Sequence, residues 1–420
     1  MWQLFGFTHS LRLTLCFGLL LLSLVAQNNL RIGTTAERLQ LEVTEPAGIR
    51  RRGYPVSLRL QLPRPVSLAT KFRLLHHSKL VAAQFRPATS NGNTDLWWLD
   101  FPTELLPHET RTYDVEYGAK IVAGPERLRG HQLIERENVF IVSNEPYINW
   151  TIPRNLNGLL QSVDFPPAEH LQPNSLGLVV RDRTGAEHVL DGKAQVIRQG
   201  TEAVALQFDS QEHPAQRDSI SWTVQLLFPS PVSWVEVMLK IEDPDNQISE
   251  VGLQLQLNLD APTTSQPTLV DLGAASTVYT SLTGNAEIEL RGAPLTQQSP
   301  RVPWQVLRGP AAQLTPFVLA PEITNGATPI VAEGWAHIMD RKRCLAIAFD
   351  RFAESTTDRI HVTAKGAFTM WRRYPDTLQR VHEKAKTLRS WLHFVHYPPQ
   401  YSAGASPQAM QNPIQVRQLP

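Results

Sequence analysis

Residues 84–118 decide the fold, and they read QFRPATSNGNTDLWWLDFPTELLPHETRTYDVEYG. The centre, residues 96–101, is apolar and aromatic, and turn-forming residues flank it on both sides. Residues 112–117 alternate polar side chains with Tyr113, Val115 and Tyr117. Alternation with a period of two is typical of a half-buried antiparallel strand. The stretch therefore predicts three strands joined by two turns.

The composition is that of a packed globular protein with more than one domain. The chain has 420 residues, of which 42% are hydrophobic and 19% charged. A length of this order favours two or three domains. The 40 basic residues almost balance the 39 acidic ones, and no basic stripe stands out, so we expect no nucleic-acid partner.

The N-terminus resembles an export signal. Residues 13–26 are apolar and follow Arg12. As a helix they would extend about 21 Å, whereas the hydrocarbon core of a bilayer is about 30 Å thick. Residues 1–27 therefore predict a signal peptide and a secreted, periplasmic or envelope protein, with an uncleaved N-terminal anchor as the alternative. No later segment predicts a membrane span.

The remaining chain is expected to be all-β, because segments such as VGLQLQLNLD at 251–260 alternate throughout. We predict a small barrel-like β domain over 39–122, a large antiparallel β-sandwich over 131–398, and an extended tail over 399–420. One late helix is predicted over 375–390, because apolar residues recur there at spacings of three and four. Cys344 lies in an apolar strand and is expected to be buried rather than reactive.

The segment at 84–118 resembles the N-terminal domain of the exo-rhamnogalacturonan lyase/YetA-like family, in which a strand ending in QF precedes a W-x-DF strand and a YG-terminated strand. A looser similarity extends over about 40–395. The resemblance implies a barrel-like domain followed by a β-sandwich, and a role with polysaccharides. Family members continue into a large helical toroid domain, and we expect residues 1–420 to comprise only the first two domains of that arrangement.

Aromatic and cationic residues gather toward the C-terminal end, where we expect a carbohydrate-binding surface. A planar guanidinium can hold a carboxylate through two hydrogen bonds, and aromatic rings offer a flat apolar face. The expected surface comprises Trp371, Arg372, Arg373, Tyr374, Trp391, His393 and Tyr397. The alternative for these residues is an ordinary one, in which the tryptophans pack in the core and the histidines make structural hydrogen bonds.

Candidates for a catalytic base are His337, Tyr374 and His393, because proton abstraction beside a carboxylate needs a titratable group. The adjacent tryptophans of the central strand have a simple interpretation. Trp97 and Trp98 must point to opposite faces of their strand, so one fills the core while the other is exposed or covers a neighbouring domain.

No metal or cofactor is expected, because zinc-type spacing is missing from the sequence. The acidic residues Glu242, Asp243 and Asp245, with Asn246, leave a calcium site as an alternative to a plain turn. Three functions stay open: a carbohydrate-binding protein related to polysaccharide lyases, an active lyase that cleaves uronate polysaccharides by β-elimination, and a structural envelope protein that binds other proteins.

Overall fold

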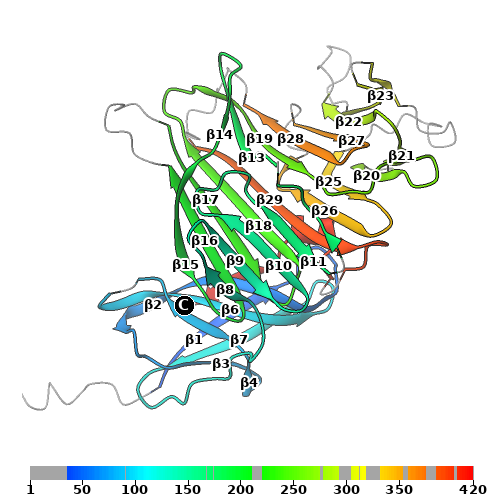
Figure 1. Ribbon diagram of the computed structural model, residues 1–420. Coiled ribbons are helices and arrows are strands. Elements are labelled where there is room, and N and C mark those ends of the chain that lie inside the picture. The colour runs from blue at the N-terminus through cyan, green and yellow to red at the C-terminus, as the bar shows by residue number, and fades with distance from the viewer. Residues whose placement is uncertain are drawn as a thin grey trace, which may run out of the picture.

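The computed structural model describes residues 36–419, except for residues 90, 167, 174, 211–219, 275–277, 293–303, 312, 318–331, 353–357, 375–384 and 402–403. Strands form nearly all of the regular structure there, as the sequence predicts, and they pair antiparallel (Figure 1). The predicted signal peptide lies outside the described residues.

Two small sheets form an N-terminal unit. The five-stranded sheet has the order β30 (Gln415–Leu419), β1 (Glu37–Thr44), β7 (Thr110–Tyr117), β3 (Phe72–His76) and β4 (Lys79–Val81). The three-stranded sheet consists of β2 (Arg51–Ser67), β6 (Asn93–Leu105) and β5 (Gln84–Pro87). Their facing sides share one core, in which the ring of Phe72 lies 4.5 Å from Trp97 and 5.5 Å from Tyr117.

The remaining strands form a large sandwich. Its eight-stranded sheet has the order β14 (Glu187–Val189), β13 (Gly177–Asp182), β19 (Ile248–Gln256), β28 (Ala367–Arg373), β27 (Arg359–Thr363), β22 (Ala286–Gly292), β23 (Trp304–Pro310) and β24 (Thr315–Pro316). A further sheet consists of β12 (Ala168–Glu169), β11 (Ser162–Phe165), β10 (Ile148–Pro153), β9 (Val139–Asn144) and β8 (Gln132–Glu135), and it packs on the same core.

A nine-stranded sheet is the other layer of the sandwich. Its order is β15 (Gly192–Arg198), β16 (Ala203–Ser210), β17 (Ser221–Pro229), β18 (Trp234–Glu242), β29 (Ala385–His396), β26 (Arg343–Phe349), β25 (Ala332–Met339), β20 (Thr268–Ala274) and β21 (Val278–Leu282). In β18, Val235, Val237 and Leu239 face the core, so Trp234 and Glu236 face outward.

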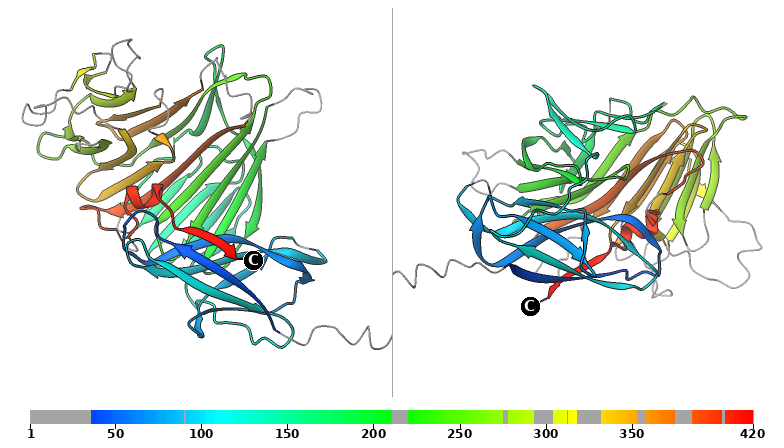
Figure 2. Two further views of the ribbon diagram at one scale, coloured as in Figure 1. Left: turned by 180° about the vertical axis from the view of Figure 1, so that it is seen from behind. Right: turned by 90° about the horizontal axis from the view of Figure 1, so that it is seen from below.

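The outer side of the nine-stranded sheet is also apolar, and the N-terminal unit covers it. Trp234, Trp335 and Trp391 are each at most 5% exposed, and they pack with Tyr54 of β2 and Met410 near the C-terminus. Figure 2 shows the C-terminal helix and strand in red where the N-terminal unit, in blue, meets the sandwich.

The described residues within 399–420 do not form the extended tail that we predicted. They contain the short helix α2 (Pro407–Gln411), capped by Ser406, and strand β30, which pairs with β1 at the other end of the chain. Apolar residues at 405, 409 and 410 are fully buried, and the sheet edge of β1 supplies the hydrogen bonds. Tertiary packing therefore orders a segment whose sequence has no period.

The predicted late helix is wrong over residues 385–390, and residues 375–384 lie outside the described part. Residues 385–390 begin β29, which pairs with both β18 and β26 in the middle of the sheet. The apolar residues from 388 onward fit a strand, because Leu388, Leu392 and Phe394 lie on one face and pack in the core. Hydrogen bonding to two neighbours decides in favour of the strand.

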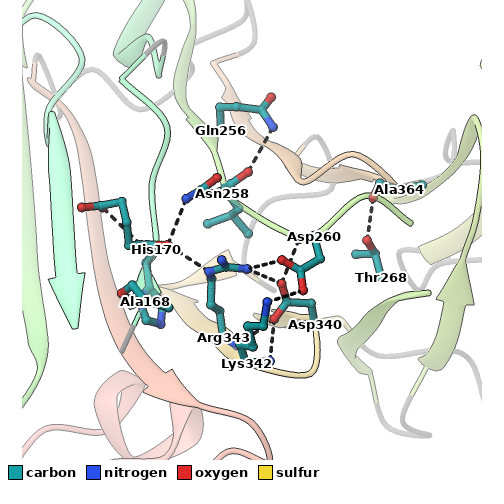
Figure 3. Close-up of polar contacts among 12 residues, drawn as sticks. Ala168, His170, Gln256, Asn258, Asp260, Thr268, Asp340, Lys342, Arg343 and Ala364 are labelled. Carbon is teal, nitrogen blue, oxygen red and sulfur yellow. Dashed lines mark hydrogen bonds and ion pairs between the residues drawn. The ribbon is translucent and has the colours of Figure 1, made fainter. Parts of the chain in front are cut away.

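Arg343, one of the cations near the C-terminal end, has a structural role (Figure 3). Its Nη1 lies 2.6 Å from Asp340 Oδ2 and 3.3 Å from Asp260 Oδ1, and its Nε donates to the carbonyl of Glu169 at 2.9 Å. The network joins the β25–β26 turn to the end of β12 and to the segment after β19. Arg343 is therefore not free to bind a ligand.

The C-terminal segment, which contains α2 and β30, is held against the N-terminal unit by a buried ion pair. The side chains of Arg51 and Glu45 are 0% exposed and 3.1 Å apart, and Arg51 also donates to the carbonyls of Ala409 at 3.0 Å and Asn412 at 2.6 Å. Removing one member of a buried pair leaves the other charge without compensation.

We predict that Arg51→Met lowers the free energy of unfolding by about 3–5 kcal/mol, because Glu45 stays buried without its partner. Urea denaturation measures the change. Arg38→Met is the matched control, since Arg38 pairs with Asp114 while 56% of its side chain is exposed, and it should have little effect. Equal effects of the two substitutions would contradict the role assigned to Arg51.

Candidate functional site

The expected surface is divided between two sheets, because Trp371 belongs to β28 and Trp391 to β29. Trp371 is 5% exposed and lies flat on the eight-stranded sheet, where a Cβ at Gly252 would come within 2.7 Å of its ring. The guanidinium groups of Arg181 and Arg359 cover it, 4.3 and 6.0 Å from the ring centre. Trp371 is therefore not available to stack on a sugar.

Arg372 and Arg373 do not form the expected pair of guanidinium groups. Arg372 is buried and donates to Asp358 at 3.0 Å and to the carbonyl of Asp350 at 2.7 Å. Arg373 is exposed, and the hydroxyl of Tyr374 donates to the carbonyl of Thr387 at 2.8 Å. Because Arg372 is engaged by these partners, it is not available to hold the carboxylate of a sugar through two hydrogen bonds.

His393 and His337 lie under the C-terminal segment. His393 is 1% exposed, its Nδ1 donates to the carbonyl of Ala405 at 3.2 Å, and burial lowers its pKa to about 4. His337 is hydrogen-bonded to the hydroxyl of Tyr401, and its Nδ1 lies 3.6 Å from Asp271 Oδ2. Both histidines make structural hydrogen bonds, which is the alternative that the sequence left open for them. Tyr397, at 38%, remains exposed.

In the turn at Asp243 and Asn246, where a calcium ion was the alternative, the described structure places the ammonium group of Lys386. The ammonium group of Lys386 bonds to Asp243 and lies 2.9 Å from Asn246 Oδ1, while Asp243 also accepts from two backbone N–H groups at 2.8 Å. Within the described ranges no group of three or more acidic, histidine or cysteine side chains is arranged to hold a metal.

A cavity of about 370 Å³ lies between the N-terminal unit and the outer face of the nine-stranded sheet. Its floor follows two cross-strand rows, Leu227–Glu236–Trp391 and Gln225–Met238–Arg389. Residues 54–57 of β2 and residues 413, 414 and 416 of the C-terminal segment form other walls. Figure 1 shows β2 and β6 of the N-terminal unit beside the ends of β15–β18.

The lining is mostly apolar, and it includes four aromatic and three charged side chains. The aromatic residues are Tyr54, Trp98, Trp234 and Trp391, and the charged residues are Arg198, Glu236 and Arg389. The side chain of Arg389 is 37% exposed, and Gln225 and Met238 are half-buried, so the cavity reaches the surface at that row. Such a lining, mostly apolar with a few polar groups, is typical of small-molecule sites.

The tryptophan pair behaves as its alternation predicts. Trp97 is 2% exposed inside the N-terminal core, whereas Trp98 points the other way, toward the sandwich. The Arg198 guanidinium stacks on the Trp98 ring at 4.2 Å. Trp98 thus covers the neighbouring unit and lines the cavity at the same time.

Arg198 is the most unusual residue of the lining. It is 6% exposed, and its Nη2 donates to Ser57 Oγ at 2.6 Å and lies 3.4 Å from Asp100 Oδ1. Its Nε and Nη1 are buried and have no hydrogen-bond partner among the described residues. A buried donor without a partner is costly, so these atoms mark a place for water or a ligand.

Two buried carboxylates, Asp100 and Glu202, lie where the N-terminal unit meets the sandwich. Burial raises the pKa of Asp100, against the influence of Arg198 and Ser57. Burial also raises the pKa of Glu202 to about 7, although Arg127 Nε is 3.3 Å away. Asp100 Oδ2 and Glu202 Oε1 have no hydrogen-bond partner in the described structure. Perturbed acids beside a cavity are a common mark of functional sites.

Comparison with known proteins supports the fold. No family model and no curated protein matches the sequence. The chain is similar to a solved protein in glycosyl hydrolase family 38 from Enterococcus faecalis, with 11% identity and a TM-score of 0.51 over 93% of this chain. It spans about half of that structure, 48% of its length. This likeness shows a shared fold and nothing more.

Two further solved structures are more distant. The chain is 11% identical to a galactose mutarotase related enzyme from Lactobacillus acidophilus, with a TM-score of 0.33 over 63% of this chain and 97% of that one. It is 10% identical to a galactose mutarotase-like protein from Lactobacillus casei, with a TM-score of 0.34 over 63% and 100%. TM-scores this low do not show that the folds are shared. None of the three structures is a rhamnogalacturonan lyase, so that resemblance stays a prediction.

In the part of the chain that the structure describes, no helix is long and apolar enough to cross a membrane.

The raised pKa of Glu202 predicts a pH-dependent stability. Its folded pKa of about 7 exceeds the unfolded value of 4.5, so the folded state binds the proton more tightly. The stabilisation by the protonated form is complete below about pH 4.5 and is lost as the pH rises toward 7; it amounts to about 3 kcal/mol at about 1.4 kcal/mol per unit.

We therefore expect Glu202→Gln to remove this dependence. The difference in unfolding free energy between variant and wild type should grow in favour of the variant from pH 5 to 8, as urea denaturation at each pH measures. A difference that stays constant with pH would show that Glu202 is ionised in the folded protein at all these values.

Proposed function

We propose that this protein binds carbohydrate in the cavity between its N-terminal unit and the nine-stranded sheet. The observation that carries the proposal is the buried, unpartnered Nε and Nη1 of Arg198 beside the ring of Trp98 in a cavity of about 370 Å³. The volume falls in the range of about 300–1,000 Å³ that small-molecule sites occupy.

The chemistry of the lining matches a sugar. A sugar ring has apolar C–H faces and a rim of hydroxyl groups that both donate and accept hydrogen bonds. Trp98 and Trp391 supply apolar surface to the cavity beside the guanidinium groups that cover part of their rings. Arg198, Glu236 and Arg389 supply donors and acceptors. The similarity of the fold to a glycosyl hydrolase family 38 protein is consistent with this proposal.

The alternative of an active uronate lyase has less support. Its candidate bases are engaged elsewhere, since His393 lies under Ala405, His337 contacts Tyr401, and the Tyr374 hydroxyl donates to a backbone carbonyl. We also propose, from residues 1–27, that the protein acts outside the cytoplasm, in the envelope or secreted. A protein-binding structural role remains the alternative if no glycan binds.

A glycan array with the full chain tests the proposal, with the absorbance of unsaturated sugars followed on soluble polysaccharides in parallel. Binding without absorbing product is expected. Binding with release of unsaturated product would favour the lyase instead. The absence of binding to every glycan would contradict the proposed function.

We predict that Trp98→Ala weakens glycan binding at least about tenfold, a loss of about 1.4 kcal/mol, because the sugar loses its aromatic surface. Tyr397→Ala is the control, since Tyr397 belongs to the surface expected from sequence and lies outside the cavity lining. Isothermal titration measures both, and melting curves check that both variants fold. Weakening by Tyr397→Ala alone would place the sugar on that surface rather than in the cavity.

A further inference from the structure

The charged groups that line the cavity are paired with opposite charges. Arg198 Nη2 lies 3.4 Å from Asp100 Oδ1, and Arg389 Nε lies 2.6 Å from Glu236 Oε1. Asp100 is 2% exposed and accepts a hydrogen bond of 2.6 Å from Ser57 Oγ. Because a buried guanidinium remains cationic, its carboxylate partner balances it. The cavity is therefore close to neutral before any ligand enters.

The next charged residues in the interface, which do not line the cavity, also form pairs of opposite charge. Arg86 lies 3.0 Å from Glu126, and Arg127 lies 3.3 Å from Glu202. Arg59, whose guanidinium lies 5.8 Å from the Trp98 ring, is exposed, and solvent and salt screen its charge. No uncompensated buried cation is found among these residues.

The unused hydrogen-bonding atoms of the Arg198–Asp100 pair are of both kinds. Arg198 Nε and Nη1 are donors, and Asp100 Oδ2 is an acceptor, and all three are buried without a partner in the described structure. A hydroxyl group both donates and accepts, whereas an ionised carboxylate accepts only. Neutral hydroxyls thus suit this combination better than a carboxylate does.

We propose that the cavity selects a neutral sugar and discriminates against the corresponding uronate, with Asp100 as the residue that sets this preference through Arg198. The inference rests on the carbohydrate-binding function proposed above. A uronate would bring a negative charge into a site whose arginines already have anionic partners, and a buried charge without compensation is unfavourable. Asp100 acts on the ligand through the charge and position of Arg198, so it is a positioning residue.

Matched sugar pairs test the inference at pH 7.5. Ligand-observed NMR titration of the full chain compares D-glucose with D-glucuronate and D-galactose with D-galacturonate. For the wild type we expect the neutral member of a pair to bind at least about tenfold more tightly, the ratio that a modest charge penalty of this kind produces. Asp100→Asn keeps the size of the side chain and removes its charge, so the uronate should gain at least about tenfold relative to the neutral sugar.

Two further variants make the result specific. Glu236→Gln removes the other balancing carboxylate and should also shift the preference toward the uronate. Asp114→Asn is the matched control, because Asp114 pairs with Arg38 on the N-terminal sheet outside the cavity lining, and it should leave the ratio unchanged. A purely structural role of Asp100 would weaken both members of a pair equally.

The outcomes separate this inference from the function on which it rests. Tighter binding of the uronate by the wild type, or an unchanged ratio in Asp100→Asn, would overturn the inference while carbohydrate binding stands. If no neutral or acidic glycan binds, on the array or in solution, the proposed function and this inference both fail. If Asp100→Asn does not fold, the inference is still tested by the relative affinity of the wild type for the neutral sugar and the uronate, and by the change in that ratio in Glu236→Gln.

Discussion

The structure depends on one constraint, namely that the nine-stranded sheet is apolar on both sides. Its inner side packs against the other sheets of the sandwich, while its outer side carries Trp234, Trp335 and Trp391, which must be kept from water. The N-terminal unit and α2 supply that cover, and Arg51 fixes them to each other. The two ends of the chain are joined for the same reason, since β30 completes the sheet that begins with β1.

The cavity lies where this cover does not fill the space above the sheet. A packed interface would place apolar side chains against the row from Leu227 to Trp391, yet Arg198, Glu236 and Arg389 are found there. Buried polar groups without partners reduce the stability of a fold. Their concentration around Arg198 and Asp100 is the pattern expected when a sequence satisfies the needs of a ligand as well as those of folding.

Much of the fold could be predicted from the sequence, because a period of two identifies strands and assigns their faces. The opposite orientation of Trp97 and Trp98 followed from that rule alone. The helix expected over 375–390 shows the limit of this rule, since a strand that is buried on both faces can also carry apolar residues three and four positions apart. Nothing local indicated that residues 385–390 would have hydrogen-bonded neighbours on both sides.

The site was harder to predict, because alternation shows which residues share a face but not what covers that face. Trp391 and His393 do face outward, as expected, but they are covered by Tyr54, which is distant in sequence, and by Ala405 and Met410 of the C-terminal segment. Arg198 and Glu236 lie in ordinary alternating strands, and no spacing distinguishes them from solvated charges. The one available signal was Trp98, which had to contact either solvent or a neighbouring domain.

Hydrogen–deuterium exchange of the full chain, with and without the best glycan from the array, tests the central claim most directly. If the sugar binds between the units, exchange should slow together in residues 54–57, 234–238 and 413–416, which line the cavity from three separate parts of the chain. Slower exchange confined to residues 371–374 and 397, or no change despite binding, would contradict a site between the N-terminal unit and the nine-stranded sheet.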